Sequence, residues 1–229
     1  MMPVRNAVGT LEDSTRRTAV YTAVTANTLV LAVLLYSYVS GRTPTAYWFF
    51  PIVWITVGVW ALVRTTPDPA DSRTTYAAAA IGAGYFLVLA AVGGIVTPAS
   101  GPAVGLTVQF TELPPGWNPA VLYDGSLVQF AVVPYSTFGY FVLAYLVYAT
   151  AIEARGAVAG GLLGLFSCVS CTVPVIASAF GSVVGGAAVT TAVQTQTYGL
   201  GTAVFVVTVL LLLYRPGLER LRRLRRLRS

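Results

Sequence analysis

The sequence predicts an all-α integral membrane protein, a bundle of six transmembrane helices with N-in/C-in orientation and a small outer loop or β-hairpin cap. Only 10% of its residues are charged and 56% are hydrophobic, whereas soluble domains have about 25% charged residues. Several apolar runs reach the roughly 18–20 residues that span a hydrocarbon core. The arginines gather in alternate connecting segments, as they do in multi-pass proteins of the cell membrane.

The predicted spans form one domain, residues 19–214, between a cytoplasmic N-terminal segment (1–18) and a basic cytoplasmic tail (215–229). The first span is expected to be retained, because Glu12 and Asp13 precede it and it is longer than the apolar core of a signal peptide. Pro134 falls inside the fourth span and predicts a kink there. Whether 181–197 crosses, re-enters or lies flat stays open. The expected spans are residues 19–39, 46–63, 76–96, 127–149, 157–180 and 198–214.

The arginines predict the orientation, because positively charged loops stay in the cytoplasm. With the N-terminus inside, every arginine except Arg42 lies inside, and an even number of spans returns the tail to the same side. The tail repeats leucine every third residue between arginines, which favours an anchor on anionic lipids. We expect no nucleic-acid partner, because the tail emerges directly from a span.

The outer loop, residues 97–126, carries the signals of a hairpin. Residues 104–111 are apolar at every second position, which is typical of a strand. Residues 120–123 supply a partner strand, and Asp124-Gly125 is a turn signal.

Absent residue types exclude several classes of site. The chain has no histidine, so histidine-ligated haem, copper and zinc sites are excluded. It also has no lysine, so it cannot form a retinal or pyridoxal Schiff base. No charged residue stands at the centre of a span, which disfavours ion-coupled pumps.

The fourth span is rich in aromatic residues. We favour packing between helices over a site that stacks a ligand or quinone. The aromatic residues are Phe130, Tyr135, Phe138, Tyr140, Phe141, Tyr145 and Tyr148.

The only two cysteines, Cys168 and Cys171, are candidate catalytic and metal-binding residues in the fifth span, together with Pro174 as a catalytic candidate. At about 1.5 Å per residue, Cys168 is expected about 16 Å deep, and the i, i+3 spacing places both sulfurs on one helical face. Pro174 leaves the carbonyl of Ser170 without its helical donor, which implies a covered cavity.

Three interpretations of the pair stay open. It is a redox couple that cycles between dithiol and disulfide, or a two-thiolate site for Cu(I), the only cofactor we consider. Alternatively the cysteines only pack, because they belong to a ridge of small residues that lets membrane helices approach closely. The ridge comprises Gly156, Gly160, Gly164, Cys168 and Thr172.

Residues 170–176 read Ser-Cys-Thr-Val-Pro-Val-Ile and resemble the Cys-x-x-Pro core of the CcdA/DsbD-type membrane thiol–disulfide transporters. That family has about six spans and hands electrons from cytoplasmic thioredoxin to outward-facing thiol proteins, in service of cytochrome maturation and copper-site assembly. The resemblance implies that Cys171 matches the family's redox cysteine. Cys168 has no counterpart, because the family places its second cysteine on a separate helix.

These patterns predict a membrane thiol protein that relays reducing equivalents or Cu(I) through a buried C-x-x-C motif, for assembly of outward-facing redox proteins. The alternative is a non-catalytic transmembrane subunit of a larger membrane complex, permease-like or a respiratory accessory. Whether the chain is an enzyme stays open. The expected partners are the lipid bilayer, anionic lipids at the tail, and a membrane complex or outward-facing redox protein.

Overall fold

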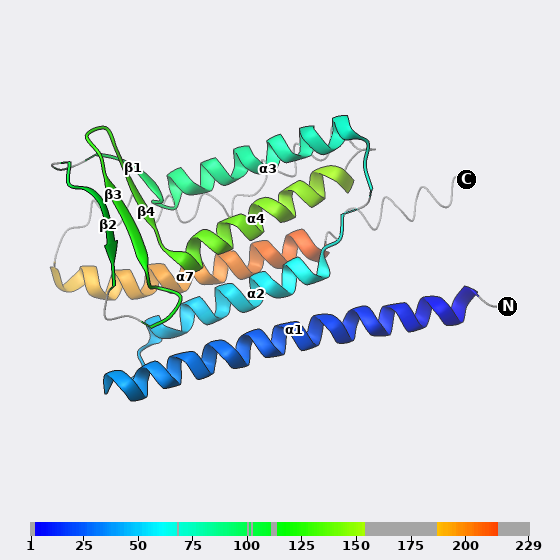
Figure 1. Ribbon diagram of the computed structural model, residues 1–229, viewed down its shortest axis with the longest axis horizontal. Helices are drawn as coiled ribbons and strands as arrows, with labels where there is room; N and C mark the ends of the chain where they lie inside the picture. The colour runs from blue at the N-terminus through cyan, green and yellow to red at the C-terminus, as the bar shows by residue number, and fades with distance from the viewer. Residues whose placement is uncertain are drawn as a thin grey trace.

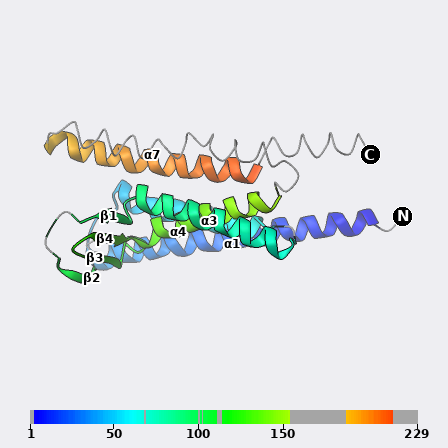
Figure 2. The same ribbon diagram turned by 90° about the horizontal axis from the view of Figure 1, so that it is seen from above.

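The computed structural model describes residues 3–67, 69–99, 101, 103–110, 114–153 and 187–214. Long helices lie side by side in this part of the chain, and a β-sheet covers one end of them (Figure 1). Seen from above, α7 forms a layer over the other helices (Figure 2). The elements are α1 (Pro3–Ser40), η1 (Ala46–Phe49), α2 (Phe50–Arg64), α3 (Ser72–Val92), β1 (Val96–Pro98), β2 (Gly105–Gln109), β3 (Ala120–Asp124), β4 (Val128–Val132), α4 (Pro134–Glu153) and α7 (Ala187–Tyr214).

Four described helices are long and apolar enough to cross a membrane: Thr15–Ser40, Ala46–Arg64, Ser72–Val92 and Pro134–Glu153. Only 11% of the apolar window in the first is buried inside the protein, so most of its apolar side chains face outward. The fifth predicted span, 157–180, lies outside the described residues. The sixth is the C-terminal part of α7, which also includes residues 187–197 in one helix.

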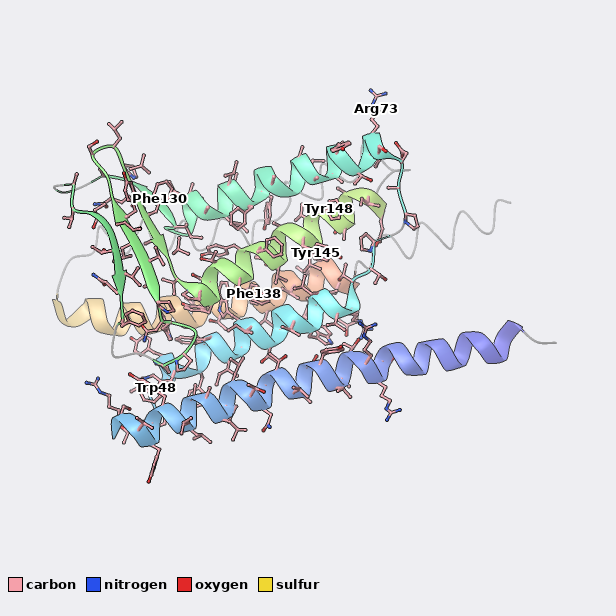
Figure 3. The ribbon with its side chains drawn as sticks, in the orientation of Figure 1. Trp48, Arg73, Phe130, Phe138, Tyr145 and Tyr148 are labelled. Atoms are coloured by element: carbon pink, nitrogen blue, oxygen red, sulfur yellow. The ribbon has the colours of Figure 1, made fainter. Side chains whose placement is uncertain are left out.

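The sheet lies at one end of the helix bundle, and the direction of each helix shows which of its termini lies there. Helices α1 and α3 run toward the sheet, whereas α2, α4 and α7 run away from it (Figure 1). Arg64 closes α2 at the end far from the sheet, where its guanidinium lies 5.9 Å from the ring centroid of Tyr214 at the end of α7. Figure 3 shows Arg73 at this same end and Trp48 at the sheet end. We call these the arginine end and the sheet end.

The helices make close contact where small residues face large ones. The core of α2, α4 and α7 includes Ala61, Val142 and Val209, each with no exposed surface. Gly82 of α3 lies so close to α4 that an added β-carbon would be 3.0 Å from the carbonyl oxygen of Ala144. The absence of a side chain at Gly82 therefore sets the distance between these two helices.

The sheet is larger than expected, so the prediction of an all-α protein with only a hairpin cap is wrong in that respect. The predicted hairpin is confirmed, since β2 and β3 pair antiparallel with Leu106 opposite Tyr123. Two further strands, β1 and β4, extend it to a four-stranded sheet in the order β1-β4-β3-β2. The predicted turn at Asp124-Gly125 joins β3 to β4, and the amide of Gly125 donates to the carbonyl of Val128.

Strand β4 and the first residue of β1, Val96, occupy positions that we expected to be helical, whereas the rest of β1 lies in the predicted outer loop. The third span was predicted to reach residue 96, but α3 ends at Val92, before Gly94, whose φ of +79° a helix does not allow. The fourth span was predicted from residue 127, but α4 begins at Pro134. The predicted kink is therefore also wrong, because a proline at the first helical position lacks only an N–H that has no helical partner.

Candidate functional site

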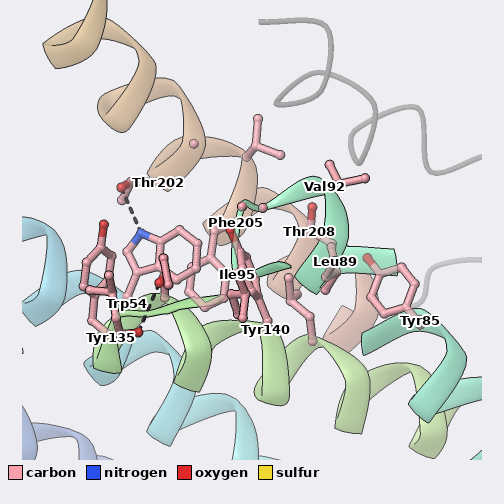
Figure 4. A pocket seen from close by; sticks show the side chains of 18 of the residues that line it. Trp54, Tyr85, Leu89, Val92, Ile95, Tyr135, Tyr140, Thr202, Phe205 and Thr208 are labelled. Atoms are coloured by element: carbon pink, nitrogen blue, oxygen red, sulfur yellow. Dashed lines mark hydrogen bonds between the residues drawn. The ribbon is translucent and has the colours of Figure 1, made fainter. Parts of the chain in front are cut away.

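A cavity of about 270 Å³ lies beneath the sheet, where α2, α3, α4 and α7 meet β4 and the connection between α3 and β1 (Figure 4). Its described lining is mainly aromatic and small, and none of the described lining residues carries a formal charge. We call it the Trp54 cavity. The aromatic residues that line it are Trp54, Tyr85, Trp117, Tyr135, Tyr140 and Phe205.

Trp54, which is 8% exposed, lies at the centre of this aromatic group. Its ring stacks on Phe205 of α7, with centroids 4.2 Å apart and planes within 6° of parallel. Its indole N–H donates a 2.9 Å hydrogen bond to the hydroxyl of Thr202 (Figure 4). A β-carbon at Gly139 of α4 would overlap the Trp54 ring, so glycine is what allows the ring to lie against α4.

Two tyrosines of α4 contact the Trp54 ring. The Tyr135 and Tyr140 rings meet it edge to face, at centroid distances of 5.6 and 5.9 Å. Edge-to-face contacts of this kind add about 0.5–1.5 kcal/mol to the burial of the rings. Helices α2, α4 and α7 therefore meet through a single aromatic cluster, which fixes one wall of the cavity.

The loop before β3 brings Trp117 to the cavity. The Trp117 indole N–H donates 2.9 Å to the carbonyl of Tyr47, and its ring lies 4.7 Å from that of Tyr135. The neighbouring Gly116 has a φ of +102°, and a β-carbon there would lie 2.5 Å from Pro51. Glycine thus allows the loop to press against the first turn of α2 and to bring Trp117 to the cavity.

Hydroxyl groups give this lining a limited polar character. The described hydroxyl-bearing residues are Tyr85, Tyr135, Ser136, Tyr140, Thr202 and Thr208, and Thr208 is buried. Ser136 donates 3.2 Å to the carbonyl of Val133, and Thr202 accepts from Trp54. Hydroxyls both donate and accept, so the lining suits a neutral molecule better than an ion.

The predicted site residues Cys168, Cys171 and Pro174 lie outside the described residues, so their redox, metal-binding and packing interpretations stay predictions. In the part of the chain that the structure describes, no three or more Cys, Asp or Glu residues cluster in a way that could hold a metal ion.

The aromatic residues of the fourth predicted span separate into different environments. Tyr135 and Tyr140 line the Trp54 cavity, whereas Phe138 and Phe141 line a second hollow that includes Phe86 of α3. Tyr145 lies further along α4 and donates 3.2 Å to the carbonyl of Thr65. Sequence analysis missed Trp54, Phe205 and Thr202 as site residues. The only available signal was Trp54 itself, a tryptophan in the interior of an apolar run.

The family model that matches this chain covers residues 2–219 and is described as a family of unknown function (DUF7546). No curated protein and no solved structure matches the chain. Because the match extends over nearly the whole sequence, the chain belongs to the family of unknown function DUF7546.

Proposed function

We propose that this chain is a six-span membrane protein, with both termini inside, that binds a flat, neutral ring compound in the Trp54 cavity at its outer end. The membrane placement is supported by the four apolar helices and by the separation of the arginine end from the sheet end. With arginines on the cytoplasmic side, the sheet and the Trp54 cavity face outward.

The connection between α4 and α7 supports the fifth crossing. Glu153 ends α4 at the arginine end, whereas Ala187 begins α7 at the sheet end (Figures 1 and 2). The polypeptide between them must therefore link opposite ends of the bundle. This agrees with one further span at 157–180, and α7 then returns the chain to the cytoplasm.

The proposed class of ligand follows from the lining of the Trp54 cavity. Its aromatic faces favour stacked and edge-to-face contacts with a flat ring, and its hydroxyls favour carbonyl or hydroxyl groups on that ring. A volume of about 270 Å³ lies near the lower limit for small-molecule sites, so it suits a head group rather than a long tail. Quinones combine these properties and partition into membranes.

Quenching of tryptophan fluorescence by decylubiquinone tests this proposal, because a bound quinone quenches an indole that it touches. We expect saturable quenching in the wild-type protein and in Trp48→Phe, and much weaker quenching in a variant in which both indoles of the described lining, Trp54 and Trp117, are replaced by Phe. Trp48 is a matched control, since it is buried against Tyr36 of α1 and is absent from the described lining. Equal quenching in the two variants, or quenching without saturation, would overturn ligand binding in the cavity.

A second candidate function is the thiol relay predicted from Cys168, Cys171 and Pro174. The spacing of the two cysteines and the outward-facing sheet end favour it. Oxidation of the two thiols to a disulfide would release two electrons and two protons, which an outward-facing disulfide protein would accept as it is reduced to a dithiol. In the Cu(I) form of this proposal, both thiolates bind the ion and pass it to an outward-facing redox protein.

Thiol counting with and without reductant tests the redox form, and a pair that never oxidises argues against it. Titration with Cu(I) against a competing chelator tests the metal form, and unchanged affinity in Cys168→Ser would end it. If both fail, the alternative of a non-catalytic subunit of a larger membrane complex gains support. The basic tail, 215–229, is proposed to bind anionic lipids in every case.

A further inference from the structure

The two faces of the sheet differ sharply in composition. Directly paired residues of antiparallel strands share a face, and successive residues alternate between faces. The pairings place apolar side chains on one face of the sheet, which we call the apolar face: Val96, Pro98, Leu106, Val108, Val121, Tyr123, Val128, Phe130 and Val132. The opposite face, or polar face, carries Thr97, Thr107, Gln109, Asp124 and Gln129 among smaller and apolar residues.

One part of the apolar face meets the helices. Val121 and Val132, which pair with each other on this face, line one hollow together with Phe138 and Phe141 of α4. The hollow also includes Phe86 of α3. This part of the apolar face therefore lies above the outer ends of α3 and α4.

The apolar face of the sheet continues on strand β2. Val108 pairs with Val121 and Leu106 pairs with Tyr123, so both point in the same direction as Val121. Nevertheless Leu106 is 68% exposed and Val108 is 51% exposed. Within the described residues, β2 is an edge strand that pairs with β3 alone, and its apolar side chains have little protein beneath them.

The exposed side chains of β2 continue the apolar surface of the helices. Phe141, which lines the hollow beneath β3 and β4, is 57% exposed on α4, and Leu87 on α3 is 67% exposed. If these helices span a bilayer, acyl chains cover Phe141 and Leu87. The same acyl chains then also cover the hollow and the apolar side chains of β2. Without lipid, these side chains would form a contiguous apolar patch in water, which soluble proteins rarely expose.

We propose that the apolar face of β2 rests on the outer leaflet of the membrane, with Leu106 and Val108 among lipid chains and Gln109 in water. This inference depends on the proposed membrane placement. The sheet is thus a half-immersed cap, which would fix the height of the Trp54 cavity at the level of the lipid head groups. A neutral ligand dissolved in the outer leaflet would then reach the cavity without passing through water.

Nitroxide accessibility in vesicles of phosphatidylcholine and phosphatidylglycerol tests the inference. Single cysteines at Val108, Gln109 and Leu87, in the full chain carrying Cys168→Ser and Cys171→Ser, each receive a spin label. We expect the ratio of oxygen to nickel-chelate collision rates to be several-fold higher at Val108 than at Gln109, its neighbour on the polar face. Leu87 reports on α3 and is expected to give a high ratio as well.

The outcomes separate the inference from the membrane placement. A high ratio at Leu87 with equal, low ratios at Val108 and Gln109 would overturn the lipid contact of the sheet and leave the spans intact. A low ratio at Leu87 would overturn the membrane placement itself. Should the cysteine-free chain not fold, photolabelling of the unmodified protein with a diazirine lipid gives the same test. Label at Leu106 and Val108 supports the contact, and label on the helices alone contradicts it.

Discussion

The indole N–H of Trp54 lies 2.9 Å from the hydroxyl oxygen of Thr202 and donates a hydrogen bond across 148 positions of the chain. Trp54 belongs to α2 and Thr202 to α7. Next to this bond, the ring of Trp54 stacks on the ring of Phe205, which is also in α7. An apolar surrounding strengthens a hydrogen bond and makes its loss costly. This bond and the ring stack therefore tie α7 to α2 at the wall of the Trp54 cavity.

Replacing Thr202 by valine is expected to destabilise the protein, because the Trp54 N–H then loses its acceptor in a part-buried place. We expect a loss of about 1–3 kcal/mol in the free energy of unfolding, measured by titration with a denaturing detergent in mixed micelles. Thr202→Ser keeps the hydroxyl and should remain close to wild type. A loss in Thr202→Ser as large as that in Thr202→Val would contradict a stabilising role of the hydrogen bond, because serine keeps the hydroxyl.

A methyl group at Gly139 is expected to disrupt the aromatic cluster, because its β-carbon would overlap the ring of Trp54 and lie 3.3 Å from Phe205. Overpacking of this kind costs about 1–3 kcal/mol, and the shifted Trp54 ring should change the emission spectrum of the protein. Gly84→Ala on α3 is the matched control, since nothing lies within 4 Å of its added β-carbon. An unperturbed spectrum in Gly139→Ala would contradict the close approach.

Removing the N-cap of α3 is expected to weaken that helix. The Asp71 carboxylate accepts from the amide of Thr74 at 3.2 Å and from its hydroxyl at 2.8 Å. Asp71→Ala should lower the free energy of unfolding by about 0.5–2 kcal/mol, whereas Asp71→Asn, an equally good cap, should change it little. Slower hydrogen exchange at the start of α3 in Asp71→Ala than in wild type would contradict this role.

Labelling of cells with a membrane-impermeant maleimide tests the orientation. In a chain carrying Cys168→Ser and Cys171→Ser, a cysteine replacing Ser126 in the β3–β4 connection should react on intact cells. A cysteine replacing Ser72 at the start of α3 should react only after permeabilisation. Both positions are exposed, so access depends on the side of the membrane. The reverse pattern would invert the proposed orientation and place the Trp54 cavity inside the cell.

Composition and the spacing of apolar runs predicted the main helices well, because a long apolar run has few alternatives to a spanning helix. They failed where short apolar segments join the sheet. Val96 and residues 128–132 continue the apolar runs of the third and fourth predicted spans, and periodicity does not separate a short apolar strand from a helix. Pairing of Val96 with Phe130, which are far apart in sequence, decides that both are strands.

The sequence by itself determined that this protein is rich in helices long and apolar enough to span a membrane, that all its arginines except Arg42 fall in alternate connecting segments, and that a hairpin lies between two of the helices. Those properties depend on local composition and on the solvation of charge and apolar surface. Only the tertiary structure decided which aromatic residues enclose a cavity and which point elsewhere. Trp54, Tyr135 and Phe205 come from three helices. Their rings meet because Gly139 leaves space for the Trp54 ring. This contact joins residues from distant segments, so no local sequence pattern predicts it.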